Sequence, residues 1–314
     1  MTPTRQPVHG VLIVDKPRGP SSTQLLGRIK GLYRAHKAGH GGTLDPMASG
    51  VLPMLFGDAT KFAQEGLDAD KGYLATLRLG QDTDSGDAEG QLLRERPVNG
   101  LTREDVEGVL IRFLGVQLQV PPMFSALKRD GRPLYELARQ GLEVERAPRP
   151  ITIHSLTLLS FELPILTIQV ECSKGTYIRV LAQDIGEALG CGAHLSELRR
   201  TRVGSLLATE SISLEVLERS DSSERVSFLR PVDFLIQDWV SVRLLEGQEA
   251  AFGHGQTIQL SAQQFQETML SRQCTSMSND RLRVLGSNER FVGIARLVGS
   301  QLRPLRLMSQ IGPH

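Results

Sequence analysis

The chain has 314 residues, of which 40% are apolar and 23% are charged, a balance typical of a globular protein. This composition excludes a disordered chain, a collagen and a coiled coil, and the length favours two domains over one. No apolar run reaches the ~18 residues of a membrane span, and the first residues lack a signal peptide. We therefore expect a cytoplasmic protein without membrane contact.

The three cysteines, Cys172, Cys191 and Cys274, are an odd number and too widely spaced to form CxxC pairs. This spacing argues against a disulfide framework and against a structural zinc site. We expect all three to be small apolar residues of the core.

The net charge of +1 conceals three segments of opposite sign. Residues 16–44 carry six basic residues and no acidic ones, and residues 45–120 carry thirteen acids against seven bases. Residues 281–306 carry six arginines against one glutamate. Clustered positive charge is typical of a phosphate-binding surface, because counterion release rewards local charge. Solvated protein faces are an equally good interpretation of charge alone.

The first two hundred residues alternate between strand and helix patterns. A strand is predicted over residues 9–15, and Pro20-Ser21-Ser22 is a typical helix start. A glycine-rich loop over residues 39–46 precedes a strand over 73–79, a helix that follows Thr102 and Asp105, a strand over 165–172 and a helix over 178–189. The pattern predicts a mixed α/β domain of the α+β class.

Two regions depart from this alternation. Residues 121–150 have prolines at both ends, six bases against four acids, and one short helix around residues 134–140, so we expect an inserted, exposed segment. After residue 238, short β-like runs are separated by Gly, Ser and Asn, which predicts a small β domain. The predicted domains are therefore residues 1–237, which contain the insertion, and residues 238–314.

The candidate chemistry centres on residues 40–50, where one carboxylate, Asp45, lies in a loop with three glycines. An Asp before a Pro is by itself most often a turn residue. No second carboxylate for two-acid hydrolysis, no Ser–His pair and no metal-ligand spacing accompany it, so we expect no metal and no cofactor. The acidic run at residues 82–89 lacks the ligand pattern of an EF-hand and is predicted to be a solvated turn.

Five motifs in this order resemble those of the TruB-type tRNA pseudouridine synthases: residues 15–22, 42–46, 71–73, 172–179 and 191–200. The resemblance covers residues 8–202 and continues more weakly to the end of the chain. It implies isomerisation of uridine 55 in the T-loop of tRNA to pseudouridine by a catalytic domain with a mixed sheet. It also implies that residues 121–150 are a thumb-like segment that grips the T-loop, and that residues 238–314 form a PUA-like RNA-binding domain.

The resemblance also implies a role for each matching residue. Asp45 would be a nucleophile or would stabilise a charged sugar, Arg179 would favour its ionised form, and Tyr73 would stack on the uracil near the C5 proton. The residues implied to contact the flipped uridine or RNA phosphates are His40, Tyr177, Leu198, Lys128, Arg139, Arg199 and Arg200. Ordinary packing or plain surface charge is the alternative for each.

The implied partner is tRNA, bound through its T-loop and its acceptor and T arms by a monomer. A guide RNA is not expected, because guide-dependent relatives usually carry basic low-complexity tails and this chain has none. The alternative function is a T-loop-binding or RNA-folding protein whose role needs no turnover. The presence of Asp45, Tyr73 and Arg179 together argues against that alternative.

Overall fold

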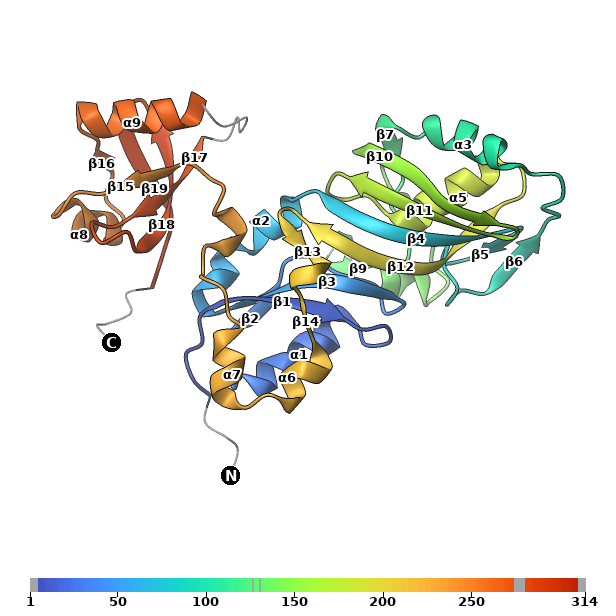
Figure 1. Cartoon of the computed structure of the whole chain (residues 1–314), viewed down its shortest axis with the longest axis horizontal. Coiled ribbons are helices and arrows are strands. Elements are labelled where there is room, and N and C mark those ends of the chain that lie inside the picture. The colour runs from blue at the N-terminus through green and yellow to red at the C-terminus, as the bar shows by residue number, and fades with distance from the viewer. Residues whose placement is uncertain (1–4, 126, 130, 274–279, 310–314) are drawn as a thin grey trace.

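The structure, a computed structural model, describes residues 5–125, 127–129, 131–273 and 280–309. A large body lies beside a smaller C-terminal domain, which is orange to red in Figure 1. Ten strands of the described chain form the large sheet of the body, and five form the C-terminal sheet. The predicted mixed α/β fold with a small C-terminal β domain is confirmed.

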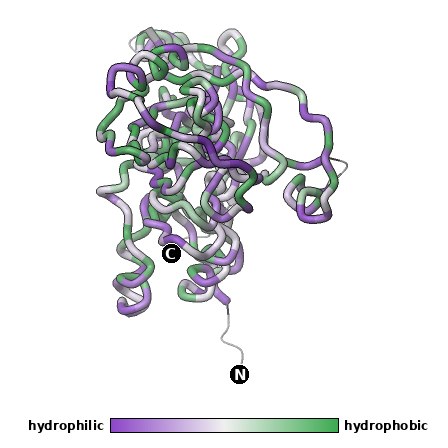
Figure 2. The backbone as a smooth tube through the Cα atoms, turned by 90° about the vertical axis from the view of Figure 1, so that its right-hand side faces the viewer, coloured by the Kyte–Doolittle hydropathy of each residue, from purple (hydrophilic) through white to green (hydrophobic). Residues whose placement is uncertain are grey.

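Hydrophobic and hydrophilic segments alternate at short intervals along the backbone (Figure 2). Within the described residues, no helix combines the length and the apolar character that crossing a membrane requires.

The large sheet is mixed. Its strand order is β14-β1-β3-β12-β4-β11-β10-β7, with β13 paired to β12 and β2 paired to β3. Neighbours run antiparallel except in the pairs β1–β14 and β3–β12, which are parallel. The strands are β1 (Gly10–Lys16), β2 (Ala38–His40), β3 (Ala48–Phe56), β4 (Lys71–Leu79), β7 (Gly115–Gln119), β10 (Arg149–Glu162), β11 (Ile165–Cys172), β12 (Ala193–Val203), β13 (Leu206–Leu207) and β14 (Ile212–Ser213).

Two small hairpins lie outside the large sheet. They are β5 (Gln81–Thr83) with β6 (Leu92–Glu95), and β8 (Lys128–Arg129) with β9 (Arg132–Pro133). The body's helices are α1 (Ser22–Leu32), η1 (Gly57–Phe62), α2 (Ala63–Asp68), α3 (Arg103–Ile111), α4 (Leu134–Ala138), α5 (Ile178–Ala188), η2 (Ala208–Glu210), α6 (Leu214–Arg219), α7 (Ser222–Ser227) and η3 (Phe234–Ile236).

The helix starts follow from side-chain capping. Ser21 Oγ accepts the Gln24 N–H at 3.2 Å, and the Ser21 N–H donates to Gln24 Oε1 at 2.8 Å. The same reciprocal box joins Thr102 and Asp105 at the start of α3. Each box satisfies backbone N–H groups that have no partner within the helix, which fixes where the helix begins.

Helices α1, α3 and α5 cover one face of the large sheet. Leu25 of α1 and Ile185 of α5 belong to the same buried core as the strand residues. The other face is covered at β1 and β3, where Val11 and Leu55 pack against Phe234 and the chain around it. Strands β1 and β3 are therefore buried on both faces, whereas β4 and β12 leave side chains of one face partly exposed.

The C-terminal domain contains helices as well as the predicted strands. Its strands are β15 (Ser241–Arg243), β16 (Ile258–Gln259), β17 (Arg281–Leu285), β18 (Phe291–Val298) and β19 (Gln301–Leu307), and its helices are α8 (Gln248–Gly253) and α9 (Ala262–Gln273). The sequence prediction missed both helices. Helix α9 is mostly polar, and Phe265 and Met269 are its apolar residues packed on the domain core.

An apolar contact joins the two domains. Phe62 of η1 and Ile236 of η3 form a buried cluster with Ile294 of β18. The rings of Phe62 and Phe291 meet edge to face, with centroids 5.4 Å apart. Because η1 directly follows β3, the C-terminal domain rests on an extension of a central strand.

Ion pairs surround this apolar contact. Arg281 Nη1 lies 2.9 Å from Glu65 Oε1 of α2, and Arg283 Nε lies 3.1 Å from Asp233 Oδ2. These two arginines belong to the basic cluster in which a phosphate surface was predicted. The structure instead engages both of them in holding the domains together.

Cys172 and Cys191 are buried free thiols, as predicted. Burial raises the pKa of Cys172 to about 12, so its thiol is protonated at neutral pH. Cys274 lies outside the described residues.

Candidate active site

Asp45 lies in the loop that connects β2 to β3. The loop begins at Gly41 rather than at Gly39 as predicted, because residues 38–40 pair with β3. The Asp45 side chain is 38% exposed, and its Oδ2 lies 3.0 Å from Nε of Arg179. Since the Arg179 side chain is only 4% exposed, the carboxylate is the accessible member of the ion pair.

Four groups from three segments hold the Arg179 guanidinium. Besides Asp45, Nε lies 3.5 Å from Asp87 Oδ2. Nη1 donates to the Ser85 carbonyl at 2.9 Å, and Nη2 donates to the Phe124 carbonyl at 2.6 Å. Because Phe124 belongs to the insertion, Arg179 connects the insertion to the Asp45 loop.

The acidic run at residues 82–89 is only in part the solvated turn that was predicted, because Asp84 and Glu89 are exposed but Asp87 is not. Asp87 is 5% exposed, and its Oδ1 accepts from Ser85 Oγ at 2.7 Å and from the Glu89 N–H at 3.1 Å. The Leu195 N–H donates to the Gly86 carbonyl at 3.0 Å, which attaches this loop to β12. The acidic pattern does not reveal this burial, because the charge that compensates Asp87 comes from a residue distant in the sequence.

Two buried side chains hold the Asp45 loop through hydrogen bonds to its backbone. Ser22 Oγ donates to the Leu44 carbonyl at 2.9 Å and accepts the Leu44 N–H at 2.8 Å. Lys16 Nζ donates to the carbonyls of Ala48 at 2.7 Å and Pro46 at 3.3 Å. Burial lowers the pKa of Lys16 to about 8. These bonds satisfy carbonyls on both sides of Asp45.

The basic stretch at residues 16–44 is only partly available to an anionic partner. Lys16 is fully buried, so its charge is not presented at the surface. Arg18 pairs with Glu197 at 3.3 Å, and Arg28 pairs with Glu218. The prediction of a phosphate-binding surface therefore does not hold for Lys16.

Arg200 is 1% exposed, so the prediction that it contacts phosphates is wrong. Its Nη1 and Nη2 donate to the carbonyls of Thr43 and Gly42, both at 3.3 Å, and its Nε donates to Val51 at 2.8 Å. Adjacent strand residues point to opposite faces, so Arg200 points into the protein whereas Arg199 points outward. Arg200 is a third buried donor to the Asp45 loop.

Tyr73 and Leu198 line the same face of the sheet as Arg200. Tyr73 is the register partner of Arg200 across β4 and β12, and the two side chains share a hydrogen bond. Leu198, two residues before Arg200, is register-paired with Ala48, just after the Asp45 loop. Tyr73 and Leu198 are each 8% exposed. Burial raises the pKa of Tyr73 to about 12, so its phenol is protonated at neutral pH.

His40 and Tyr177 flank this group of residues. His40 ends β2, and within the described residues its buried Nδ1 has no hydrogen-bond partner. Burial and the nearby Arg200 lower the pKa of His40. Tyr177 is the N-cap of α5, and its backbone N–H donates to Gln119 Oε1 at 2.8 Å. Its position sets the first turn of α5, where Arg179 lies.

The predicted phosphate contacts lie outside the buried group. Lys128 is exposed on β8, and the exposed Arg139 has its guanidinium carbon 5.6 Å from the centroid of the Tyr135 ring. Arg199 donates to both carboxylate oxygens of Asp15, at 3.0 and 2.8 Å. The structure leaves these cations at the surface and does not bring them into contact with Asp45.

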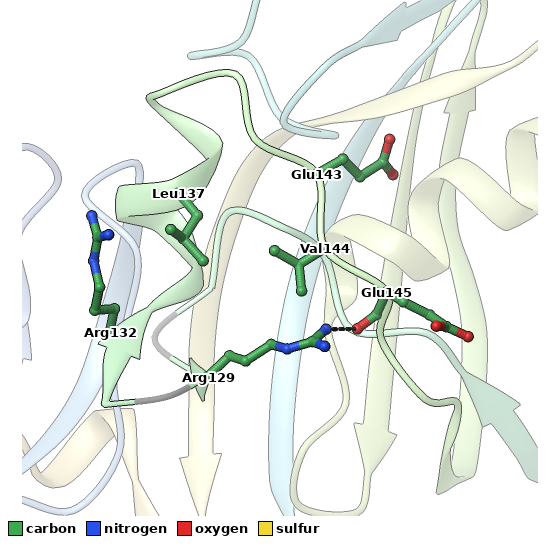
Figure 3. A pocket seen from close by; sticks show the side chains of 6 residues that line it. All are labelled: Arg129, Arg132, Leu137, Glu143, Val144 and Glu145. Atoms are coloured by element: carbon green, nitrogen blue, oxygen red, sulfur yellow. Dashed lines mark hydrogen bonds between the residues drawn. The ribbon is translucent and has the colours of Figure 1, made fainter.

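The insertion carries an open pocket of its own, with a volume of about 520 Å³. Six residues line it, as Figure 3 shows: Arg129, Arg132, Leu137, Glu143, Val144 and Glu145. The Arg129 guanidinium reaches the Glu145 carbonyl at 2.9 Å (Figure 3). No residue proposed from the sequence lines this pocket, so it is separate from the Asp45 site.

The Asp45 site offers one accessible carboxylate in otherwise buried, hydrogen-bonded surroundings. Such a group is suited to form a covalent bond to a carbon electrophile or to stabilise a cationic sugar. Within the described residues, no three side chains from His, Cys, Asp and Glu are grouped so that they could hold a metal ion. Asp87, Arg200 and Lys16 are the residues that sequence reasoning placed wrongly at the surface. For Arg200, the alternation of strand residues that separates it from Arg199 was the available signal.

Comparison with known proteins places this site in context. Residues 30–178 match the N-terminal domain model of the TruB family of pseudouridylate synthases. Residues 179–237 match the C-terminal domain of tRNA pseudouridylate synthase B, and residues 241–308 match the C-terminal model of pseudouridine synthase II TruB.

Whole-chain relatives and solved structures agree with these matches. The chain is 51% identical to a tRNA pseudouridine synthase B from Burkholderia lata, covering 97% of this chain and 91% of that one. It is 49% identical to one from Cupriavidus metallidurans, covering 97% and 95%. A Cbf5-Nop10-Gar1 complex contains a chain similar in structure, with a TM-score of 0.70, 25% identity and coverage of 95% and 84%. The chain therefore belongs to the TruB family of pseudouridylate synthases.

Proposed function

We propose that the protein isomerises uridine 55 in the T-loop of tRNA to pseudouridine, with Asp45 as the nucleophile. The observation that carries this proposal is the 3.0 Å ion pair in which Asp45 is accessible and Arg179 is buried. The relatives named as tRNA pseudouridine synthases support tRNA as the substrate.

The reaction moves the uracil from one attachment to another without net oxidation. The N1–C1′ bond breaks, the C5–C1′ bond forms, and one proton leaves C5 while one is gained at N1. Asp45 bonds either to the anomeric carbon or to the uracil ring, and the breaking of that bond regenerates the carboxylate. No oxidant, reductant or group donor is consumed, so the isomerisation needs no cofactor.

The residues around Asp45 orient the reacting groups. Arg179 fixes the carboxylate through a charge-assisted hydrogen bond. Tyr73 stacks on the uracil and lies near the C5 proton, and its raised pKa keeps the phenol protonated at neutral pH. A uridine in a folded loop must flip out to reach Asp45, and His40, Tyr177 and Leu198 line the space that receives it.

The surface cations Lys128, Arg139 and Arg199 contact phosphates and so position the RNA. In this proposal residues 1–237 form the catalytic domain and residues 238–314 form a PUA-like RNA-binding domain. The protein acts as a monomer without a guide RNA, in the cytoplasm, where tRNA is located.

The proposal is tested by incubating the protein with an unmodified tRNA transcript and mapping pseudouridine at single-nucleotide resolution. We expect one product, at position 55, and none in a matched transcript with cytidine at that position. Tight tRNA binding without pseudouridine would instead support a T-loop-binding protein that needs no turnover. Product at another position would contradict the assignment to uridine 55.

A further inference from the structure

Three arginines lie directly opposite one another on adjacent strands of the C-terminal sheet. Arg281 of β17 is paired in register with Arg296 of β18, and Arg296 with Arg303 of β19. We call these three residues the arginine row. Like charges at directly opposed positions destabilise an antiparallel sheet, so this arrangement gains stability from an anion placed against it.

The arginine row lies on the sheet face that the large domain partly covers. On the opposite face, Leu282 and Leu302 are buried in the core of the C-terminal domain. On the same face as the row, Ile294 is buried against Phe62 of η1. The row therefore lies at the rim of the domain interface, where the covered surface ends.

The members of the row differ in how firmly they are engaged. Arg281 is paired with Glu65, whose side chain is 14% exposed. Arg296 pairs with Asp280 at 2.6 Å, but both side chains are about half exposed, and such exposed pairs contribute little to stability. Within the described residues, no salt bridge is formed by Arg303, which contacts Gln301. Arg296 and Arg303 can therefore exchange their present contacts for a phosphate with little loss of stability.

Helix α2 connects the arginine row to the candidate active site. Glu65 of α2 contacts Arg281, and Asp68 at the end of α2 lies 2.9 Å from Nζ of Lys174. The Lys174 side chain is 59% exposed, and this residue lies three positions before Tyr177. Both acidic residues of α2 are thus paired with cations, and basic side chains flank the helix on both sides.

We propose that the arginine row, α2 and Lys174 form a track for an RNA backbone outside the T-loop, in which Arg296 and Arg303 each contact a phosphate. The inference rests on the proposed function, because it takes the RNA to be a tRNA whose T-loop lies at Asp45. The interface between Phe62 and Ile294 keeps the row at a fixed separation from the active site. An RNA long enough to reach both is therefore bound more tightly than an isolated T-arm hairpin.

The test compares a double variant, Arg296→Ala with Arg303→Ala, on two RNAs over a range of salt concentrations. For full-length tRNA we expect several-fold weaker binding and a log–log salt slope smaller by about two, one for each lost phosphate contact. The affinity for the T-arm hairpin stays unchanged. The matched control is Arg103→Ala with Arg219→Ala, which removes two exposed arginines, each paired with one glutamate, from α3 and α6.

Unchanged tRNA affinity in the double variant, or an equal loss for tRNA and hairpin, would overturn the track. If the double variant is unstable, Arg303→Gln replaces it in the test. This variant removes one exposed charge, so the log–log salt slope of tRNA affinity should be smaller by about one. Failure of the proposed function is distinguishable, because it appears in the unaltered protein as absence of pseudouridine. The comparison of tRNA with hairpin still tests the track in that case.

Discussion

The Asp45 loop and the insertion at residues 121–150 both contribute to the candidate active site, but different kinds of contact hold them in place. The loop is hydrogen-bonded from within the protein by three buried side chains, those of Lys16, Ser22 and Arg200. The insertion presents exposed cations, and the Phe124 carbonyl joins it to Arg179. A reacting carboxylate must be fixed within fractions of an ångström, whereas phosphate contacts tolerate long side chains.

Holding the Asp45 loop requires buried charged side chains, whereas the cations of the insertion remain exposed to solvent. Burial lowers the pKa of Lys16 and of Arg200, which shows that their charged forms are disfavoured where they lie. Both nevertheless donate to backbone carbonyls of the Asp45 loop. Stability is thus given up to hold a functional loop, a pattern expected at active sites.

Among the variants that test this difference, Arg200→Met is expected to have the largest effect, on both stability and turnover. The variant leaves three carbonyls without their donor, which costs about 1–3 kcal/mol for each group that stays unsatisfied. We expect the melting temperature to fall by roughly 10 °C and turnover to be lost. The control is Arg199→Met on the same strand, which removes only a partly exposed ion pair with Asp15, worth about 1 kcal/mol. Equal melting temperatures in thermal unfolding would contradict the role of Arg200.

Tyr73→Leu is expected to separate chemistry from binding. Turnover should fall by about 10²-fold or more, because the uracil is no longer held in position next to Asp45. Affinity for tRNA should hardly change, because one flipped base supplies only ~1–3 kcal/mol of stacking and much of that offsets the unstacking cost. Single-turnover assays beside binding titrations measure both quantities. Tyr73→Phe keeps the ring and removes the hydroxyl. Normal turnover in this variant would assign the loss in Tyr73→Leu to the ring, and reduced turnover would assign it to the hydroxyl.

The insertion should show the reverse behaviour. Lys128→Ala or Arg139→Ala is expected to weaken tRNA binding several-fold for every tRNA and to reduce the salt slope by about one. The rate at saturating tRNA and the melting temperature should stay the same, because both residues are exposed. Arg103→Ala on α3 is the matched control. If affinity and slope are unchanged, the insertion does not grip RNA.

The smallest effect concerns the pH dependence of stability at His40. Its folded-state pKa is lowered from 6.5, so below pH 6.5 the unfolded chain binds more protons than the folded one. The free energy of unfolding should therefore decrease as the pH falls from 6.5 toward the folded-state pKa. In His40→Asn, which does not titrate, denaturant unfolding at pH 7 and pH 5.5 should show a smaller decrease. The same decrease in both proteins would exclude His40 as its source.

Local signals predicted much of the fold. The strand over residues 165–172 has the same bounds in the structure, and helices begin after Ser21 and Thr102 as expected, the second with the predicted capping box. Hydrophobic periodicity and helix capping depend on residues that are close in the sequence, so a single sequence is enough to predict them. Helix α9 was not predicted, because its sequence is mostly polar and shows no clear apolar face.

The candidate site was only partly predictable. The motifs indicated that Asp45 and Arg179 act together, and the structure places them 3.0 Å apart. The burial of Asp87, Arg200 and Lys16 was not foreseen, because it depends on partners brought together by the sheet. A charged residue in a sequence gives no sign of whether water or a buried carbonyl receives its hydrogen bonds.

The central claim, that the fixed carboxylate performs the chemistry while other groups grip the RNA, is tested most directly with Asp45→Asn. Product formation and tRNA affinity are measured on the same preparation, in a single-turnover assay and a binding titration. The amide keeps nearly the same shape but cannot act as a nucleophile or counter-charge. We expect tRNA affinity close to that of the unaltered protein and no pseudouridine; measurable turnover by Asp45→Asn would contradict the account.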